Sequence, residues 1–265
     1  MKIYVQTDYE GCAGVVHFET RDKTTALAAE HWRRMRQLLT DEVKAALDGA
    51  CRAGATEFVL NDSHGSGYNV LFEQLGPDVR VIHGRLDRLP FWLPLLDETF
   101  DAVIGVGMHP MAETEHGILP HTRWDVNGVK LPEMGMTCAI AGCHDVPAVF
   151  TSGDRALCEQ VRSLVPEIET AAVKDAFSPY TAVSHTPAAA REMIRSGVRR
   201  GLERRAEIKP FRIDPPYEMT LISKPGQPTW GPCRGDDFID VVRDLLRLCG
   251  CSGEDQSLDG YQYPK

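Results

Sequence analysis

The sequence predicts an α/β protein with a largely parallel sheet flanked by helices, and a smaller α/β subdomain towards the carboxyl end. Short apolar runs typical of buried strands alternate with longer segments of helical periodicity through the first two thirds of the chain. One run, residues 102–107, is continuously apolar, as expected of a central parallel strand buried on both faces. We expect a larger domain over residues 1–175 and the subdomain over residues 176–265.

The elements of the larger domain follow from composition and end signals. Helices are expected where apolar residues fall at helical spacing, with Gly54 ending the first helix and Asp154 capping the third. Asn127-Gly128 predicts a hairpin turn within residues 124–131. The expected strands are residues 3–5, 56–60, 79–82, 102–107, 146–150 and 170–173, and the expected helices are residues 24–53, 133–141 and 154–164.

The subdomain begins with a helix over residues 186–206, because Thr186-Pro187 is a capping residue followed by proline at the first helical position. Its six arginines are interpreted as a solvated face or a subunit contact. A strand over residues 217–222, a Gly/Pro-rich loop to Gly235 and a helix over residues 237–248 are expected next. The last residues, 250–265, are expected to be disordered or loosely docked.

Composition excludes several classes of protein. The net charge of -9 argues against a nucleic-acid partner, which favours a basic surface. No apolar run is long enough to span a membrane, and the acidic amino-terminal stretch is unlike a signal peptide. The eight cysteines contain no paired CxxC motifs, so neither a disulfide framework nor a structural zinc knot is expected. We expect a cytoplasmic protein.

The first expected strand leads directly into two carboxylates, in Thr7-Asp8-Tyr9-Glu10-Gly11. Because Asp8 and Glu10 are two residues apart, their side chains would point to the same side of an extended backbone. Two carboxylates side by side repel each other unless a cation neutralises them. This stretch therefore indicates a cation site, with a solvated polar loop as the alternative.

Other ligand-type side chains follow neighbouring strands, at the edge where sites in parallel α/β sheets lie. His64 follows the second strand, His109 follows the continuously apolar run, and Glu133 begins a helix. With Asp8 and Glu10 they make three carboxylates and two imidazoles, the ligand types of a two-zinc or two-manganese hydrolase. One carboxylate could bridge the ions, and a shared water would ionise near neutral pH. The histidines interpreted as ordinary loop or core residues are His17, His31, His83, His144 and His185.

The order of these motifs resembles that of the M55 metallopeptidases, the D-aminopeptidases of dipeptide-transport operons. The motifs that carry the resemblance are Thr7-Asp8-Tyr9-Glu10-Gly11, Asn61-Asp62-Ser63-His64, Gly107-Met108-His109, His121-Thr122 and Glu133-Met134-Gly135. The resemblance implies two zinc ions per chain, with Mn2+ or Co2+ as substitutes, and Asp8 as the bridge. It makes Glu10, His64, His109 and Glu133 the other ligands, and His121 the catalytic residue. It also implies a homo-oligomer, a ring-like decamer.

The function implied by the resemblance is that of a zinc-dependent aminopeptidase. It would remove amino-terminal residues, expected to be D-amino acids, from short peptides or amino-acid amides through a metal-bridged hydroxide. His121 would shuttle a proton to the leaving amine or stabilise the oxyanion, with His116 in the same loop as the second candidate. Asp62 would either orient His64 or cap its turn.

Two other functions stay open from the residues alone. A dinuclear phosphoester hydrolase would use the same metal ligands, although no cluster of Lys and Arg lies near the site. A non-catalytic α/β module that binds a small molecule is the other, although the chain has neither GxGxxG nor a P-loop.

The chain departs from the family pattern at three places. Pro132 stands before Glu133 where the family usually has glycine, and Ser178-Pro179-Tyr180 stands where Ser-Arg is expected. After about Pro216 the chain is shorter than in the family, and the strand directly before the last helix is expected to be missing. These departures bear on substrate contacts and on assembly.

Overall fold

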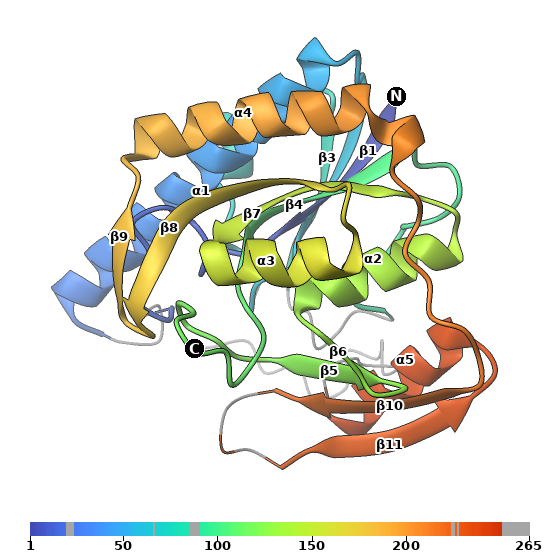
Figure 1. Ribbon diagram of the computed structural model, residues 1–265. Helices are drawn as coiled ribbons and strands as arrows, with labels where there is room; N and C mark the ends of the chain where they lie inside the picture. The colour runs from blue at the N-terminus through green and yellow to red at the C-terminus, as the bar shows by residue number, and fades with distance from the viewer. Residues whose placement is uncertain (20–23, 66, 85–90, 224–225, 227, 251–265) are drawn as a thin grey trace, which may run out of the picture.

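The computed structural model describes residues 1–19, 24–65, 67–84, 91–223, 226 and 228–250. The carboxyl-terminal stretch expected to be disordered or loosely docked lies outside these ranges, apart from residue 250. The elements are arranged around a seven-stranded sheet and a separate four-stranded sheet (Figure 1).

The large sheet has the strand order β3-β2-β1-β4-β7-β8-β9. All neighbouring pairs are parallel except β8 and β9, so the prediction of a largely parallel α/β sheet is confirmed. The central strands β1 and β4 are almost entirely buried, as their apolar composition requires. The strands are β1 Lys2–Thr7, β2 Glu57–Asp62, β3 Val79–Ile82, β4 Ala102–Met108, β7 Ala148–Asp154, β8 Glu169–Ser178 and β9 Thr181–Ser184.

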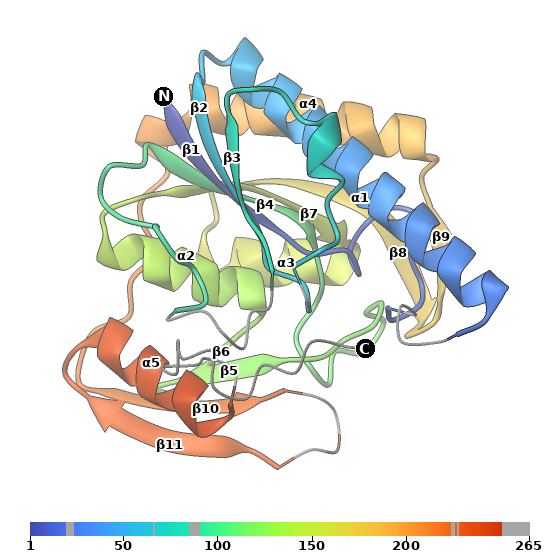
Figure 2. The same cartoon turned by 180° about the vertical axis from the view of Figure 1, so that it is seen from behind.

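Helices cover both faces of this sheet (Figures 1 and 2). Helix α1 (Ala26–Arg52) packs along α4 (Pro187–Glu203) on one face, and α2 (Glu133–Cys143) and α3 (Arg155–Leu164) cover the other. The expected end signals are confirmed: Asp154 and Thr186 accept capping hydrogen bonds, and Gly54 follows α1 at a φ of +91°. Short 3-10 helices span Phe72–Gln74 and Arg205–Glu207. In the described ranges, no helix combines the length and the apolar character that a membrane crossing needs.

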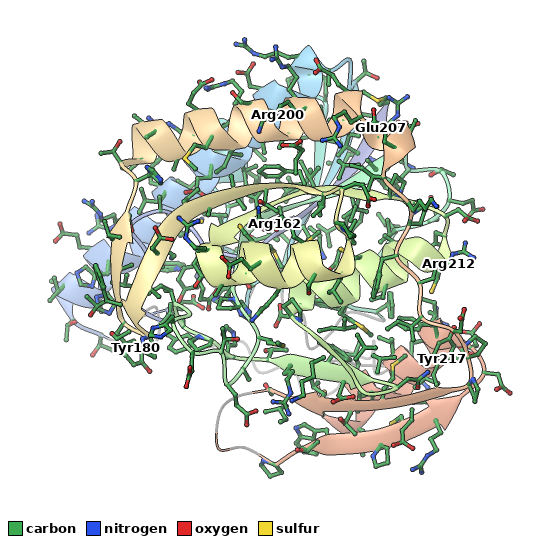
Figure 3. All side chains as sticks on the ribbon, viewed as in Figure 1. Arg162, Tyr180, Arg200, Glu207, Arg212 and Tyr217 are labelled. Atoms are coloured by element: carbon green, nitrogen blue, oxygen red, sulfur yellow. The ribbon has the colours of Figure 1, made fainter. Side chains whose placement is uncertain are left out.

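The arginines of α4 pair within the chain. Arg195 lies 2.5 Å from Asp48 of α1, and Arg200 lies 3.0 Å from Glu169 at the start of β8. Figure 3 labels Arg200 on helix α4. These partly exposed pairs each contribute about 0–1 kcal/mol, so they tether α4 to its neighbours only weakly.

The second sheet is antiparallel and has the order β11-β10-β5-β6. It joins the hairpin β5 (Arg123–Val126) and β6 (Val129–Leu131) to β10 (Tyr217–Ile222) and β11 (Trp230–Gly235), and α5 (Phe238–Leu248) packs on it. The expectation that the strand directly before the last helix is missing is wrong, because β11 occupies that place. The boundary expected at residue 175 falls within β8, which continues the large sheet.

Candidate metal centre

Two glycines allow the ends of β1 and β4 to approach each other closely. Gly11 donates to the Gly107 carbonyl at 2.8 Å, and a Cβ at Gly11 would lie 2.0 Å from the Met108 carbonyl oxygen. Gly107 has a φ of +73°, and a Cβ there would lie 2.1 Å from the Asp8 carbonyl oxygen. Side chains would prevent this contact, so the glycines set the short separation between Asp8 and the residues that follow β4.

The first cluster of the site consists of Asp8, Glu10 and His64, which follow β1 and β2. Residues 9–12 form a turn, so the expectation of an extended backbone here is wrong. The two carboxylates nevertheless converge, because both approach the same nitrogen. His64 Nδ1 lies 2.8 Å from Asp8 Oδ1 and 3.1 Å from Glu10 Oε2.

The second cluster consists of His109, Glu133 and His121. His109 Nε2 lies 3.6 Å from Glu133 Oε1, at the amino terminus of α2, and 3.4 Å from Asp8 Oδ2. The His121 ring stacks on the His109 ring, with centroids 3.7 Å apart and planes at 17°. Asp8 therefore directs one oxygen to each cluster.

Burial and mutual charge perturb the carboxylates. Burial, followed by the charge of Glu10, raises the pKa of Asp8. Burial alone would raise the pKa of Glu10, but the adjacent His64 charge and the hydrogen bond to Asp8 lower it to about 2. Burial alone would also raise the pKa of Glu133, but the hydrogen bond and charge of His109 outweigh burial, and the pKa is lowered. Negative charge is thus concentrated on both sides of Asp8.

The imidazoles compensate for this charge. Burial opposes protonation of His109, but hydrogen bonding and charge from Glu133 raise its pKa to about 10. The carboxylates likewise raise the pKa of His64 against the effect of burial. Burial and the positive His109 ring lower the pKa of His121 to about 4. The carboxylates therefore favour the positively charged forms of His64 and His109.

The donor atoms of both clusters suit a metal ion. In each cluster the three donor atoms lie within 4.8 Å of one another. Among the described residues, both carboxylate oxygens of Glu10 and His109 Nε2 are buried, and beyond the ion-pair contacts of 3.1–3.6 Å within the clusters they make no hydrogen bond of ordinary geometry. Burying carboxylate and imidazole atoms without hydrogen-bond partners raises the free energy of the folded protein unless a cation binds them. These residues therefore fit a metal ion.

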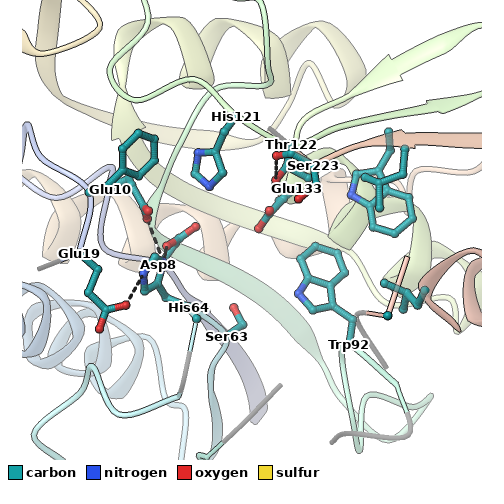
Figure 4. Close-up of a pocket in the computed structure, with 16 residues that line it drawn as sticks. Asp8, Glu10, Glu19, Ser63, His64, Trp92, His121, Thr122, Glu133 and Ser223 are labelled. Carbon is teal, nitrogen blue, oxygen red and sulfur yellow. Dashed lines mark hydrogen bonds and ion pairs between the residues drawn. The ribbon is translucent and has the colours of Figure 1, made fainter. Parts of the chain in front are cut away.

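A cavity of about 520 Å³ opens onto both clusters (Figure 4). One side of it is polar, with Asp8, Glu10 and His64 beside Glu19. Another part is apolar and comes largely from the second sheet and α5. Its residues are Trp92, Trp124, Leu221 and Leu246, and the two indole rings stack with centroids 6.0 Å apart.

The loop that carries His121 is fixed by backbone hydrogen bonds. The Ile118 amide donates to Asp154 at the end of β7, and the Leu119 amide donates to the Pro179 carbonyl in the β8–β9 turn. The Leu119 carbonyl in turn lies 2.8 Å from His121 Nδ1. His116 is exposed and does not line the cavity, so the structure does not favour the second candidate.

Asp62 takes one of the two roles left open for it. Its carboxylate accepts hydrogen bonds from the backbone amides of Asn69 and Val70 and from the Asn69 side chain. It therefore closes the turn that follows β2, and the expectation that it orients His64 is not supported.

Sequence reasoning did not identify several residues around the site. Glu19 lies 3.3 Å from His64 Nε2. In the sequence, the only sign of this contact was the position of Glu19 in the loop after β1. Lys174 is buried and donates to the carbonyls of Glu10, Cys12 and Val15 at 2.5–2.9 Å. In the sequence, the only indication of this role was that Lys174 is a single lysine within a strand.

An α/β sheet with carboxylates and imidazoles clustered at the carboxyl ends of its strands, beside a cavity, is typical of metal-dependent hydrolases. The comparisons identify which class of hydrolase it is. The sequence profile of the M55 peptidase family, described as D-aminopeptidase, matches residues 1–226. The chain therefore belongs to the M55 peptidases and is a metallo-aminopeptidase, a hydrolase of peptide bonds.

Individual proteins agree with this assignment. The chain is 29% identical over 240 residues to a D-aminopeptidase of Bacillus subtilis (strain 168), covering 87% of this chain and 84% of that protein. It is also similar to the solved structure of the Zn-dependent D-aminopeptidase DppA from Bacillus subtilis, described as a self-compartmentalizing protease. There the TM-score is 0.84 at 24% identity, covering 94% of this chain and 97% of the other. The resemblance seen in the motifs is confirmed, and the phosphoesterase and binding-module alternatives lose their support.

Proposed function

We propose that this chain is a zinc-dependent aminopeptidase that releases amino-terminal D-amino acids from short peptides or amino-acid amides. The zinc requirement and the D-preference are those named for the Bacillus subtilis relatives. The family assignment supports the cleavage of peptide bonds. The geometry of Asp8 supports a dinuclear centre.

The observation that carries the proposal is the division of the Asp8 carboxylate between two clusters, 2.8 Å from His64 Nδ1 and 3.4 Å from His109 Nε2. Asp8, Glu10 and His64 would hold one ion. Asp8, His109 and Glu133 would hold the other. When bound, two zinc ions supply Lewis-acid polarisation of the scissile carbonyl and lower the pKa of water.

The remaining residues bind substrate and move the proton. His121 has its Nδ1 against the Leu119 carbonyl, so its Nε2 is the atom available to the reacting groups. From there it would deliver a proton to the leaving nitrogen. The apolar part of the cavity, including Trp92 and Trp124, would exclude water and contact an apolar side chain of the peptide.

The test combines metal content with a substrate panel. We expect about two zinc ions per wild-type chain by mass spectrometry, and faster hydrolysis of D-alanyl than of L-alanyl amides or dipeptides. Asp8→Ala should lose both ions or nearly both, because a bridging carboxylate serves each. Full metal content in Asp8→Ala would exclude the bridge, and hydrolysis of phosphoesters in place of amides would exclude the peptidase mechanism.

We propose in addition that the enzyme is a homo-oligomer, with a ring-like decamer as the expected form. The description of the Bacillus subtilis structure as self-compartmentalizing supports this. Light scattering should then report a particle several times heavier than the 29.4 kDa chain. A monomer at micromolar concentration would contradict the proposal.

A further inference from the structure

We propose that Glu19 is a positioning residue of the metal centre, which holds the His64 ring so that Nδ1 faces Asp8 and Glu10. This inference rests on the proposed metal-dependent function. It adds a residue outside the five expected ligands and outside the motifs that identify the family.

The two nitrogens of His64 face different partners. Nδ1 lies 2.8 Å from Asp8 and 3.1 Å from Glu10, and Nε2 lies 3.3 Å from Glu19 Oε2 (Figure 4). The His64 and Glu19 side chains are each only 13% exposed, so water screens their interaction weakly. If Nδ1 presents its lone pair to a cation, Nε2 carries the hydrogen and requires an acceptor. Glu19 provides it.

The other two imidazoles of the site use a different acceptor. His109 Nδ1 lies 2.9 Å from the Pro110 carbonyl, and His121 Nδ1 lies 2.8 Å from the Leu119 carbonyl. Both acceptors belong to the backbone near the histidine itself. His64 has instead a charged carboxylate from a separate segment of the chain, and a charged acceptor makes the stronger hydrogen bond.

Local packing makes Glu19 the suitable partner for this ring. Asp62, two residues from His64, is already occupied by the amides of Asn69 and Val70. The Tyr9 ring meets the His64 ring edge to face, with centroids 4.2 Å apart. Tyr9 limits the tilt of the imidazole, and Glu19 fixes the direction in which Nε2 points.

A carboxylate behind a ligating histidine fixes the tautomer and raises the basicity of the ligand nitrogen. Loss of such a partner typically lowers metal affinity about 10- to 100-fold. Because Glu19 lies 3.3 Å from His64 Nε2, we expect the effect on the ion that His64 would hold, with the other ion unchanged. A purely structural role would instead lower the stability of the metal-free protein.

The test measures both zinc affinities of the intact protein by competition with a chromophoric chelator, together with the unfolding temperature of the metal-free form. Glu19→Leu removes the acceptor, Glu19→Gln keeps an acceptor oxygen without its charge, and Glu73→Leu is a control at an exposed glutamate remote from the cavity. We expect Glu19→Leu to lower the affinity for one zinc ion about 10- to 100-fold and to leave the affinity for the other unchanged. Glu19→Gln should be intermediate, and the metal-free unfolding temperatures should match.

Two results would overturn this inference without affecting the proposed function. One is that Glu19→Leu leaves both zinc affinities unchanged. The other is that it lowers both affinities equally and also lowers the unfolding temperature of the metal-free protein. A wild-type chain that binds no zinc would overturn the proposed function as well. The failures of the two proposals are therefore distinguishable.

Discussion

His121 is the side chain whose role is most open to experiment at the scale of single residues. Its donor nitrogen belongs to the same cluster as His109 and Glu133, so the geometry also permits it to bind a metal. In the proposed centre five other side chains would supply ligands to both ions, with Asp8 shared between them. We therefore assign His121 to proton transfer.

His121→Ala should keep both zinc ions and the fold, while turnover falls about 100-fold or more, the usual scale for loss of a general acid or base. His116→Ala is the matched control, because His116 lies on the same loop but is exposed and away from the cavity. Metal content and amide hydrolysis should be measured on both variants together. Loss of zinc in His121→Ala would make this histidine a ligand, and near-normal turnover would remove it from the mechanism.

Glu42 should make stability depend on pH. This carboxyl on α1 accepts the Ala13 amide at 2.8 Å, and burial raises its pKa from 4.5 to about 7, against the lowering effects of Ala13 and Lys174. Between these two values the folded protein binds more protons than the unfolded chain. The contribution of this group to stability is therefore complete below pH 4.5 and is lost as pH rises through 7.

The corresponding variant is Glu42→Gln, which keeps an acceptor but does not ionise. Its unfolding temperature relative to wild type should rise between pH 5 and pH 8, by the equivalent of roughly 3 kcal/mol. Thermal unfolding at a series of pH values provides the measurement, and Glu73→Gln at an exposed position is the control. A difference that does not change with pH would show that Glu42 is already ionised in the folded protein.

The five predicted metal ligands could be found from sequence because they share one rule, whereas His121 came only from the family resemblance. They follow successive strands, and the carboxyl ends of parallel strands meet at one edge of the sheet. The structure places Asp8, Glu10, His64, Glu133 and His121 in the lining of one cavity, with His109 buried against His121, although the order of the strands was not derivable from the chain alone. Glu19 and Trp92 could not be found in this way, because loops position them and no periodicity marks them.

At the scale of elements, the two strands that were not expected are both sheet edges. β11 contains Gly231-Pro232, which reads as a loop, but an edge strand tolerates proline because one side of it has no strand neighbour. β9 has four residues, none of them buried, so it lacks the apolar signal of an inner strand. Both depend on a partner strand that local sequence does not specify.

Asp154 connects a helix cap to the catalytic loop. One of its oxygens accepts the Leu157 amide at the start of α3, at 2.9 Å, and the other accepts the Ile118 amide at 2.6 Å. Asp154→Ala should lower the free energy of unfolding by roughly 2–4 kcal/mol, from the lost cap and the unpaired buried amide. It should also lower turnover with zinc retained, because the His121 loop loses an anchor.

Thr186→Ala is the control for this prediction. Thr186 caps α4 by accepting the Ala189 amide, away from the cavity. Thr186→Ala should lower the free energy of unfolding by about 1 kcal/mol and leave turnover unchanged. Urea unfolding gives the stabilities, and amide hydrolysis well below the unfolding temperature gives the activities. Equal turnover in the two variants would show that the hydrogen bond to Ile118 does not matter to catalysis.

At the scale of the whole molecule, the site combines two sheets. The large sheet provides the charged side chains, and the second sheet and α5 provide the apolar part of the cavity through Trp124, Leu221 and Leu246. These residues come from both halves of the chain. A cavity formed by such distant segments is a property of tertiary packing, so the sequence indicated the ligands but not the substrate-binding surface.

The metal centre also lies where four elements end: β1, β2, β4 and the amino terminus of α2. Two ions shared among their side chains would link these elements, and they would bind the folded chain in preference to the unfolded one. Ligand binding of this kind stabilises by about 4 kcal/mol when the free ion exceeds its dissociation constant a thousandfold. For a chain of this size that corresponds to roughly 10 °C in unfolding temperature.

Removal of zinc by a chelator should therefore lower the unfolding temperature by roughly 10 °C, and added zinc should restore it. Asp8→Ala should respond much less to either treatment, because it lacks the carboxylate that faces both clusters. Differential scanning calorimetry of the two proteins, with and without zinc, measures the effect. The same unfolding temperature in wild-type protein before and after verified metal removal would show that the ions do not link these elements, whatever their part in catalysis.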